Sequence, residues 1–169
     1  FGDPVLRTPA APVETFDKEL RTLIKDLFDT MQDAPGSGLA APQIGVPLRA
    51  FTYWIDDELG YLVNPDLTLD ETDLVEEQEG CLSIPGMRAA VPRALKVRYS
   101  GVDCDGNPVS REVSGFHARV VQHECDHLDG VLYPQRLHDL RLFGFADELK
   151  RALEAAAQAA AAKTQPANA

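Results

Sequence analysis

The sequence has few cysteines, few basic residues and no long apolar run, and each shortage argues against a class of protein. Its three cysteines are an odd number and lie far apart, so no disulfide framework is indicated and a reducing compartment fits better. Sixteen lysines and arginines stand against 27 aspartates and glutamates, a net charge of −11. This charge argues against a broad nucleic-acid surface and against binding to an anionic membrane. No apolar run approaches a membrane span.

Length and composition are those of one ordinary globular domain. The chain has 169 residues, of which 44% are hydrophobic and 25% charged. A chain of this size buries roughly 70% of its unfolded surface, which supplies a core without disulfide bonds. We find no internal repeat.

Three segments have the pattern of helices. In residues 17–31 the apolar positions follow the spacing 3, 1, 3, 1, 3, which predicts an amphipathic helix with Asp17 as its N-cap. A second helix is expected over residues 115–128, ending before Gly130. Residues 145–162 are rich in Ala, Glu, Lys and Leu and predict a third helix. Its alanine faces bury little, so we expect it to protrude.

Strand signals occupy the middle of the chain. Strands are predicted at residues 48–55, 61–63, 90–102 and 109–113. Asp105-Gly106 is a hairpin turn between the last two. Residues 70–79 carry six carboxylates and are expected to form a solvated edge. Within them, Glu79 is expected to pair with Arg88 or Arg93.

The fold predicted from these elements is α+β. Antiparallel strands pack around a central helix that carries the His-Glu-x-x-His motif, and a C-terminal helix follows. We expect a catalytic domain over residues 1–144, beginning with an extended, proline-rich arm at residues 1–15. Residues 145–169 would form the C-terminal helix and a tail, disordered from Thr164.

The strongest chemical signal is the stretch His123-Glu124-Cys125-Asp126-His127. Histidines four apart on a helix share one face, so both imidazoles reach one metal ion. Glu124 is next to the first ligand and reaches a water on that ion without being a ligand itself. Phe116 and Val120 precede the histidines on the same stripe, so we expect this face to point into the core.

The remaining cysteines, histidines and acids are less telling. Cys81 lies in a glycine-flanked turn and is either a third ligand or a buried free cysteine. Cys125 lies about 200° round the helix from each histidine and points away from the metal. Asp126 either supports the site or faces solvent. No role is assigned to Cys104, His117 and His138.

Three segments also match a known family, in order and in separation. They are GSGLAAPQ at residues 36–43, EGCLS at 79–83 and QHECDHLDG at 122–130. Residues 2–7 look like the family's N-terminus as well. Over about residues 1–137 the chain resembles the peptide deformylases.

The resemblance implies a hydrolase that removes the formyl group from the N-terminal formylmethionine of nascent polypeptides. It implies one divalent metal ion held by Cys81, His123 and His127, with water in the fourth position. Iron(II) is expected first, and zinc, nickel or cobalt can replace it in this family.

A mechanism for formyl hydrolysis follows from the chemistry of these residues. The ion lowers the pKa of its bound water. Glu124 takes a proton from that water as general base and later passes it to the leaving amine. The ion, the side-chain amide of Gln43 and the backbone N–H of Leu82 are expected to stabilise the negative charge on the former carbonyl oxygen.

The resemblance also places the substrate. The peptide would lie extended along the loop at Gly38, as an added strand, where glycine allows close approach. Candidates for the pocket of the methionine side chain are Phe116, Val120 and the ring of His123. Three residues depart from the family pattern. Ser37 replaces an aliphatic residue, and Arg119 and Glu77 stand where family pockets are often apolar. These changes bear on side-chain preference rather than on the reaction.

The expected partners are nascent formylated peptides and, by resemblance, the ribosome near its exit tunnel. No sequence-specific nucleic-acid contact and no membrane contact are expected. The expected location is the bacterial cytoplasm. Because the chain begins at Phe1 rather than Met, an organellar location stays open.

Two other functions fit the histidine motif alone. A zinc endopeptidase would often take its third ligand downstream, where the candidates are Asp129, His138, Asp139, Asp147 and Glu148. The EGCLS context of Cys81 argues against this class. A structural metal site would close all four positions with protein ligands, and only three convincing ligands are present.

Overall fold

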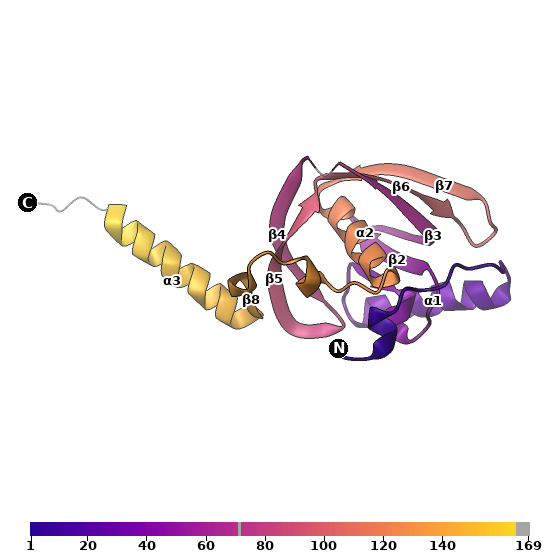
Figure 1. Cartoon of the computed structure of the whole chain (residues 1–169), viewed down its shortest axis with the longest axis horizontal. Helices are drawn as coiled ribbons and strands as arrows, with labels where there is room; N and C mark the ends of the chain where they lie inside the picture. Colours follow the sequence, from indigo (N-terminus) through magenta and orange to yellow (C-terminus); the bar gives the residue numbers. More distant parts are fainter. Residues whose placement is uncertain (71, 165–169) are drawn as a thin grey trace, which may run out of the picture.

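One helix passes through the middle of the molecule, between two sheets. This helix, α2 (Gly115–Leu128), has a five-stranded sheet on one side and a three-stranded sheet on the other (Figure 1). The computed structural model describes residues 1–70 and 72–164. The predicted α+β arrangement is confirmed, with antiparallel strands around the helix that carries the histidine motif.

All strand pairs in the two sheets are antiparallel. The larger sheet has the order β1 (Gly38–Ala40), β2 (Ala50–Ile55), β3 (Glu58–Leu69), β6 (Lys96–Val102) and β7 (Pro108–Ser114). The smaller has the order β4 (Leu74–Cys81), β5 (Ile84–Ala94) and β8 (Phe143–Phe145). The other helices are α1 (Lys18–Asp33) and α3 (Ala146–Thr164), and the 3₁₀ turns are η1 (Pro4–Arg7), η2 (Ala41–Ile44), η3 (Tyr133–Arg136) and η4 (Leu140–Leu142).

The first helix forms as its apolar spacing predicts. The Asp17 carboxylate caps α1 by accepting the N–H groups of Glu19 and Leu20, at 2.9 and 3.1 Å. The helix buries one stripe of side chains, which consists of Leu20, Leu23, Ile24, Leu27 and Met31. This stripe packs against β1 and β2, so α1 covers the outer face of the larger sheet.

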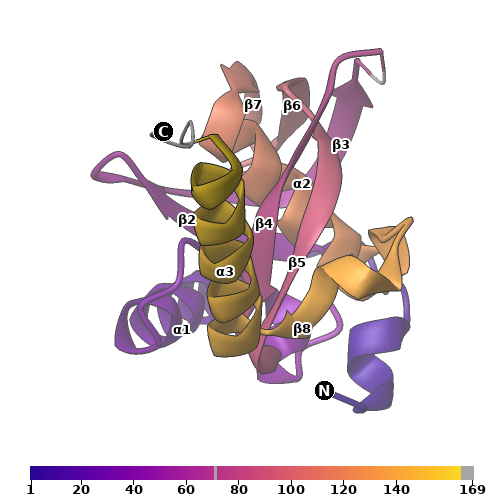
Figure 2. The same cartoon turned by 90° about the vertical axis from the view of Figure 1, so that its left-hand side faces the viewer.

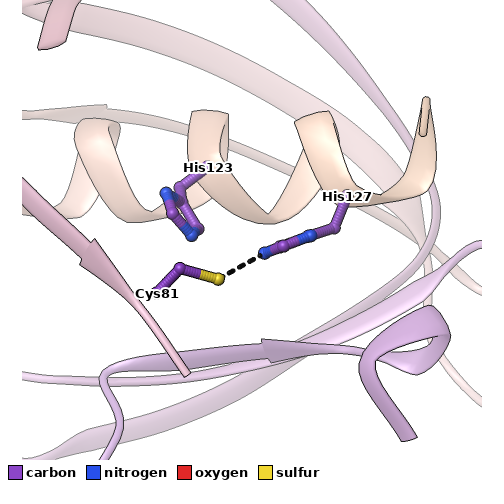
Figure 3. Close-up of side chains that lie close together, drawn as sticks. All are labelled: Cys81, His123 and His127. Atoms are coloured by element: carbon purple, nitrogen blue, oxygen red, sulfur yellow. Dashed lines mark hydrogen bonds between the residues drawn. The ribbon is translucent and has the colours of Figure 1, made fainter. Parts of the chain in front are cut away.

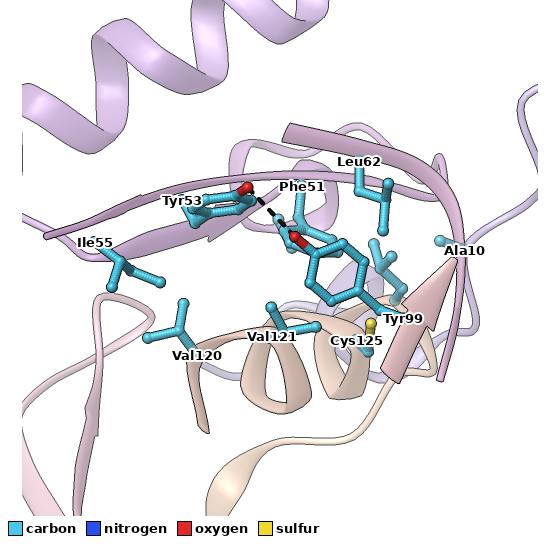
Figure 4. Close-up of a cluster of buried hydrophobic side chains, with 11 residues drawn as sticks. Ala10, Phe51, Tyr53, Ile55, Leu62, Tyr99, Val120, Val121 and Cys125 are labelled. Atoms are coloured by element: carbon cyan, nitrogen blue, oxygen red, sulfur yellow. Dashed lines mark hydrogen bonds between the residues drawn. The ribbon is translucent and has the colours of Figure 1, made fainter. Parts of the chain in front are cut away.

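The inner face of the larger sheet packs against α2 (Figure 4). Phe51, Tyr53 and Tyr99 from the sheet meet Val121 and Cys125 from the helix. Cys125 is only 5% exposed and lies in this apolar cluster, so the prediction that it points away from the histidines' face is confirmed. By packing the side of α2 that carries Val121 and Cys125 against the larger sheet, this cluster turns the side that carries the histidines away from that sheet.

The prediction of one continuous strand over residues 90–102 is wrong, because this segment belongs to two strands, β5 and β6. The chain leaves the smaller sheet at the end of β5 and enters the larger sheet with β6, which begins at Lys96. At the break, Leu95 donates its N–H to Asp73 O and accepts the N–H of Gly115. Alternation of apolar residues is the same in both sheets, so it does not reveal the change of sheet.

Two further predictions need correction. The arm over residues 1–15 is not simply extended, because it contains the turn η1 and buries Leu6. Residues 72–78 are exposed or half-buried, and most of them lie in β4, the edge strand of the smaller sheet, as the predicted solvated edge requires. Glu79 is the exception, because it is only 5% exposed. Residue 71, also counted in that edge, lies outside the described residues.

The C-terminal helix protrudes as predicted. In Figure 1, α3 runs away from both sheets, and in Figure 2 it stands in front of β4 and β5. The tail expected to be disordered falls, beyond Thr164, on residues outside those described. No helix in the described part of the chain is both long and apolar enough to cross a membrane.

Candidate active site

Three side chains suited to metal binding converge beside α2. Cys81 Sγ lies 3.2 Å from His127 Nε2, and one ligand atom from each of Cys81, His123 and His127 lies within 4.8 Å of the other two. Figure 3 shows the thiol facing both rings across the gap between β4 and the helix. The three atoms are near enough to share one ion.

The backbone explains how these residues meet. The histidines are four apart on α2, so their rings lie one turn apart on the same face. Cys81 ends β4, where the pairing with β5 shifts register between Gly80 and Cys81. A bulge of this kind re-aims the side chain that follows it, and here the bulge is at the residue whose thiol faces the histidines.

Glu79 orients the first histidine. Its carboxylate accepts a hydrogen bond from His123 Nδ1 at 2.9 Å, which leaves Nε2 free to bind a metal. Burial alone would raise the pKa of Glu79, but hydrogen bonds from His123 and Arg93 outweigh it and hold the pKa at about 2. Of the two arginines expected to pair with Glu79, Arg93 does so, at 2.8 and 3.0 Å. Within the described part of the chain, Arg88 makes no ion pair with Glu79, whereas Arg119 does.

The ion pairs continue past Glu79 through the interior. Arg93 also binds Asp126 at 2.6 Å, and Asp126 binds Arg136 at 2.6 Å. Asp126 is 6% exposed, so the open choice between a supporting and a solvent-facing role is decided in favour of support. The Glu79–Arg93 pair was one of the two expected alternatives, but the continuation to Asp126 and Arg136 was not predicted, since these residues lie in α2 and η3.

Glu124 lies beside the metal ligands and is held there by close packing. It is 3% exposed, and its Oε2 has no hydrogen-bond partner among the described residues. A Cβ at Gly38 would stand only 2.3 Å from Glu124 Oε1. A side chain at position 38 would overlap the Glu124 carboxylate, which explains why this residue is glycine. This reason is independent of the expected approach of a peptide to the same loop.

Gln43 and Leu82 border the same site. Gln43 Oε1 accepts the Ala40 N–H at 2.8 Å, and Nε2 lies 3.1 Å from Ser83 Oγ and 3.7 Å from Cys81 Sγ. The amide is thereby fixed with its N–H₂ end toward the ligands. Leu82 follows Cys81 directly and is 40% exposed. Both residues line the cavity over the metal cluster.

That cavity has a volume of about 570 Å³ and is walled by β1, β4, β5 and α2. Phe116, Val120 and His123, the candidates for a methionine pocket, all line it. Phe116 is 55% exposed, so its expected place in the core is wrong. It stands in the first turn of α2, where the helix passes the open side of the cavity.

The electrostatics of the cluster suit a cation. Burial lowers the pKa of His123, but hydrogen bonds with Cys81 and Glu79 outweigh it and raise the pKa to about 10. Burial lowers the pKa of His127 to about 3. A divalent cation would replace the proton shared in this cluster, and the donor set of one thiol and two imidazoles is one that such cations take. The residues present fit a metal ion.

The downstream residues weighed for an endopeptidase lie elsewhere. Asp129 is paired with Arg49 at 2.7 Å, and His138 is 3.6 Å from Glu76 at the surface. Among the residues described, the side chain that could bind a metal ion together with His123 and His127 is Cys81.

The geometry defines a class of protein, the metal-dependent hydrolases, because a carboxylate stands beside three metal-type ligands on a His-Glu-x-x-His helix. Comparison with known sequences gives the family. The profile described as polypeptide deformylase matches residues 1–142. The chain belongs to this family, whose members remove the formyl group from the N-terminal methionine of nascent peptides.

Individual relatives agree along most of the chain. The peptide deformylase of Acidothermus cellulolyticus is 55% identical over 166 residues, covering 98% of this chain and 91% of that protein. Peptide deformylase 1 of Nitrosomonas europaea is 50% identical, covering 88% and 91%. The crystal structure of peptide deformylase from Thermus thermophilus superposes with a TM-score of 0.77 at 46% identity, covering 81% of this chain and 82% of that one.

The close contact at Gly38 leads to a prediction. In a Gly38→Ala variant the new methyl group would overlap Glu124, and the confined carboxylate would have to turn away. We expect kcat to fall by about 10- to 100-fold, in line with a misplaced acid–base group, while the bound metal is retained. Formate release and metal content measure this. Ser37→Ala, one residue earlier, is the control, and equal activity of the two variants would contradict the argument.

Proposed function

We propose that this chain removes the formyl group from N-formylmethionyl peptides, with the residues around Cys81, His123 and His127 as its active site. The observation that supports this most is the position of Glu124, buried beside three metal-type ligands in the wall of a peptide-sized cavity. Membership of the deformylase family supplies the reaction.

Cys81, His123 and His127 would hold one divalent ion, with iron(II) proposed first and zinc, nickel or cobalt as substitutes. When bound, the ion acts as a Lewis acid, which lowers the pKa of water and stabilises negative charge on oxygen. The donor set of one thiolate and two imidazoles suits all four metals. Glu79 keeps His123 in the tautomer that presents Nε2.

Glu124 is the proposed general base and acid. Without a cation, burial raises its pKa to about 7, and a cation nearby favours the ionised form. The carboxylate takes a proton from the attacking water at Oε2, which has no other partner among the described residues. It then delivers this proton to the amine nitrogen as the C–N bond breaks, so formate and a free N-terminus result.

Gln43 and Leu82 are the proposed donors to the developing oxyanion. The Gln43 amide is already fixed by Ala40 and Ser83, so little reorganisation is needed during the reaction. The Leu82 backbone N–H follows the ligand Cys81 directly. The peptide would extend along β1 at Gly38, a strand edge of the larger sheet.

We also propose the natural substrates and the cellular location of this protein from its family. The substrates are nascent peptides, met near the ribosomal exit tunnel in the bacterial cytoplasm. The proposed catalytic unit is residues 1–144, and the proposed C-terminal segment begins at residue 145. Phe145 still pairs with Met87 of β5, so the two parts adjoin at β8.

Purified, metal-loaded protein should release formate from a short formyl-Met peptide and should not cleave an unformylated peptide. A chelator should abolish the activity, and iron(II), nickel or cobalt should restore it. Cleavage of internal peptide bonds without formate release would favour an endopeptidase instead.

The role of Cys81 gives a separate prediction. A Cys81→Ser variant replaces a thiolate with a much weaker ligand, so we expect metal affinity to fall by more than the roughly 10- to 100-fold that losing an outer partner costs. Titration with cobalt(II) measures the affinity, and the thiolate-to-cobalt absorption band should disappear. Cys104→Ser, at a buried cysteine of another cluster, should change neither. An unchanged affinity in Cys81→Ser would mean that the third ligand lies elsewhere.

A further inference from the structure

A buried arginine stands in the wall of the active-site cavity. Arg119 lies on α2, is 5% exposed and borders the cavity together with Phe116 and Val120. A pocket for a methionine side chain would be expected to be apolar throughout. The guanidinium therefore calls for an explanation in terms of what enters the cavity.

The hydrogen bonds of Arg119 hold it rigidly. Nε donates to Glu77 at 3.1 Å, Nη1 donates to Glu79 and to Val91 O, both at 2.8 Å, and Nη2 donates to Val75 O at 2.7 Å. A guanidinium has five N–H donors in a fixed plane. Four are used by these partners in β4 and β5. Within the described part of the chain, one hydrogen on Nη2 has no acceptor.

The position of Arg119 relative to the metal ligands sets which substrate atoms it can meet. It precedes His123 by four residues, so it lies on the same face of α2, about 6 Å toward the N-terminus. This distance is comparable to the reach of an extended methionine side chain. A substrate whose formyl group lies at the metal cluster and whose side chain follows α2 would bring its sulfur toward Arg119.

We propose that the enzyme also deformylates peptides that begin with N-formylmethionine sulfoxide, and that Arg119 determines this by donating a hydrogen bond to the sulfoxide oxygen. This inference rests on the proposed deformylase function. Oxidation makes the methionine side chain polar and chiral, and a polar group without a partner is costly in an apolar pocket. A charge-assisted hydrogen bond offsets that cost.

The reaction itself is unchanged. Water adds to the formyl carbon, the C–N bond breaks, formate leaves, and the amine nitrogen receives the proton. The sulfur is neither oxidised nor reduced. Because the remaining N–H direction of Arg119 is fixed by its other bonds, one sulfoxide epimer should be hydrolysed faster than the other.

The test compares kcat/KM for formyl-Met, formyl-methionine-sulfoxide and formyl-norleucine peptides of the same downstream sequence. For the metal-loaded wild-type protein we expect the sulfoxide peptide to be within about 100-fold of the methionine peptide, because an apolar pocket would reject it by more. In the double variant Arg119→Met/Glu77→Leu, which removes both charges, the sulfoxide-to-methionine ratio should fall at least a further 10-fold. The norleucine-to-methionine ratio should not fall.

A matched control is Arg98→Met, at an exposed arginine paired with Glu112, which should leave all ratios unchanged. A wild-type ratio below one hundredth overturns the inference, and this measurement stands even where the double variant fails to fold. A smaller than 10-fold change in a folded double variant overturns the role of Arg119. Hydrolysis of formyl-Met with rejection of the sulfoxide leaves the proposed function intact, whereas no hydrolysis of either peptide overturns both.

Discussion

A Glu124→Gln variant should lose about 10²- to 10⁴-fold in kcat, the usual contribution of a positioned general acid–base group, while it keeps its metal. The substitution preserves the size of the side chain and removes only the group that accepts and returns a proton. Cys81, His123 and His127 are untouched, so the ion should remain bound. Formate release under saturating peptide, with metal content measured on the same sample, gives both quantities.

An exposed carboxylate provides the control for this variant. Glu112→Gln, in β7, should keep full activity because its side chain is 64% exposed and pairs only with Arg98. The mechanism would be wrong if Glu124→Gln retained more than a tenth of the wild-type rate with one ion bound. Because Gly38→Ala acts through Glu124, it should cost little in a chain that already carries Glu124→Gln.

The second large effect concerns stability. Arg93→Ala should lower the free energy of unfolding by about 3–5 kcal/mol, because removing one member of a buried ion pair leaves its partners uncompensated. Arg93 is 5% exposed and binds both Glu79 and Asp126. Arg119 and Arg136 reach these acids as well, which places the loss within this range rather than above it. Denaturant unfolding of the metal-free protein measures it without the contribution of metal binding.

The matched change is Arg98→Ala, which breaks the exposed pair with Glu112 and should cost less than about 1 kcal/mol. If Arg93→Ala cost no more than Arg98→Ala, the buried pairs would contribute nothing to stability. In the metal-loaded form, Arg93→Ala should also weaken metal binding, since Glu79 would lose the partner that fixes its carboxylate against His123.

The parts predictable from the sequence were those that depend on local spacing. The periodicity of residues 17–31 and the cap at Asp17 predicted α1 to within two residues at its end. The spacing of His123 and His127 placed both rings on one face of a helix, and the same geometry excluded Cys125. These predictions succeed because helix period and capping are properties of a few consecutive residues.

The sequence indicated an arginine partner for Glu79, but the burial of this carboxylate was not predictable. In the sequence it ends an acidic run that looks like a solvated edge, yet in the structure it is buried between Arg93, Arg119 and His123. Whether a carboxylate is buried depends on partners that arrive from other elements, and no local pattern contains them. The same holds for Asp126, whose partners lie in β5 and η3.

The sequence by itself therefore determined the helix that carries the ligands, the ligand types and, through three ordered motifs, the resemblance to a family. Tertiary structure alone decided that the chain changes sheets at Leu95, that Gly38 must leave room for the Glu124 carboxylate, and that a guanidinium closes part of the cavity. The physical reason is the distance along the chain over which each interaction acts. Periodicity and capping act over one or two turns, whereas close packing and charge compensation join residues far apart in the chain.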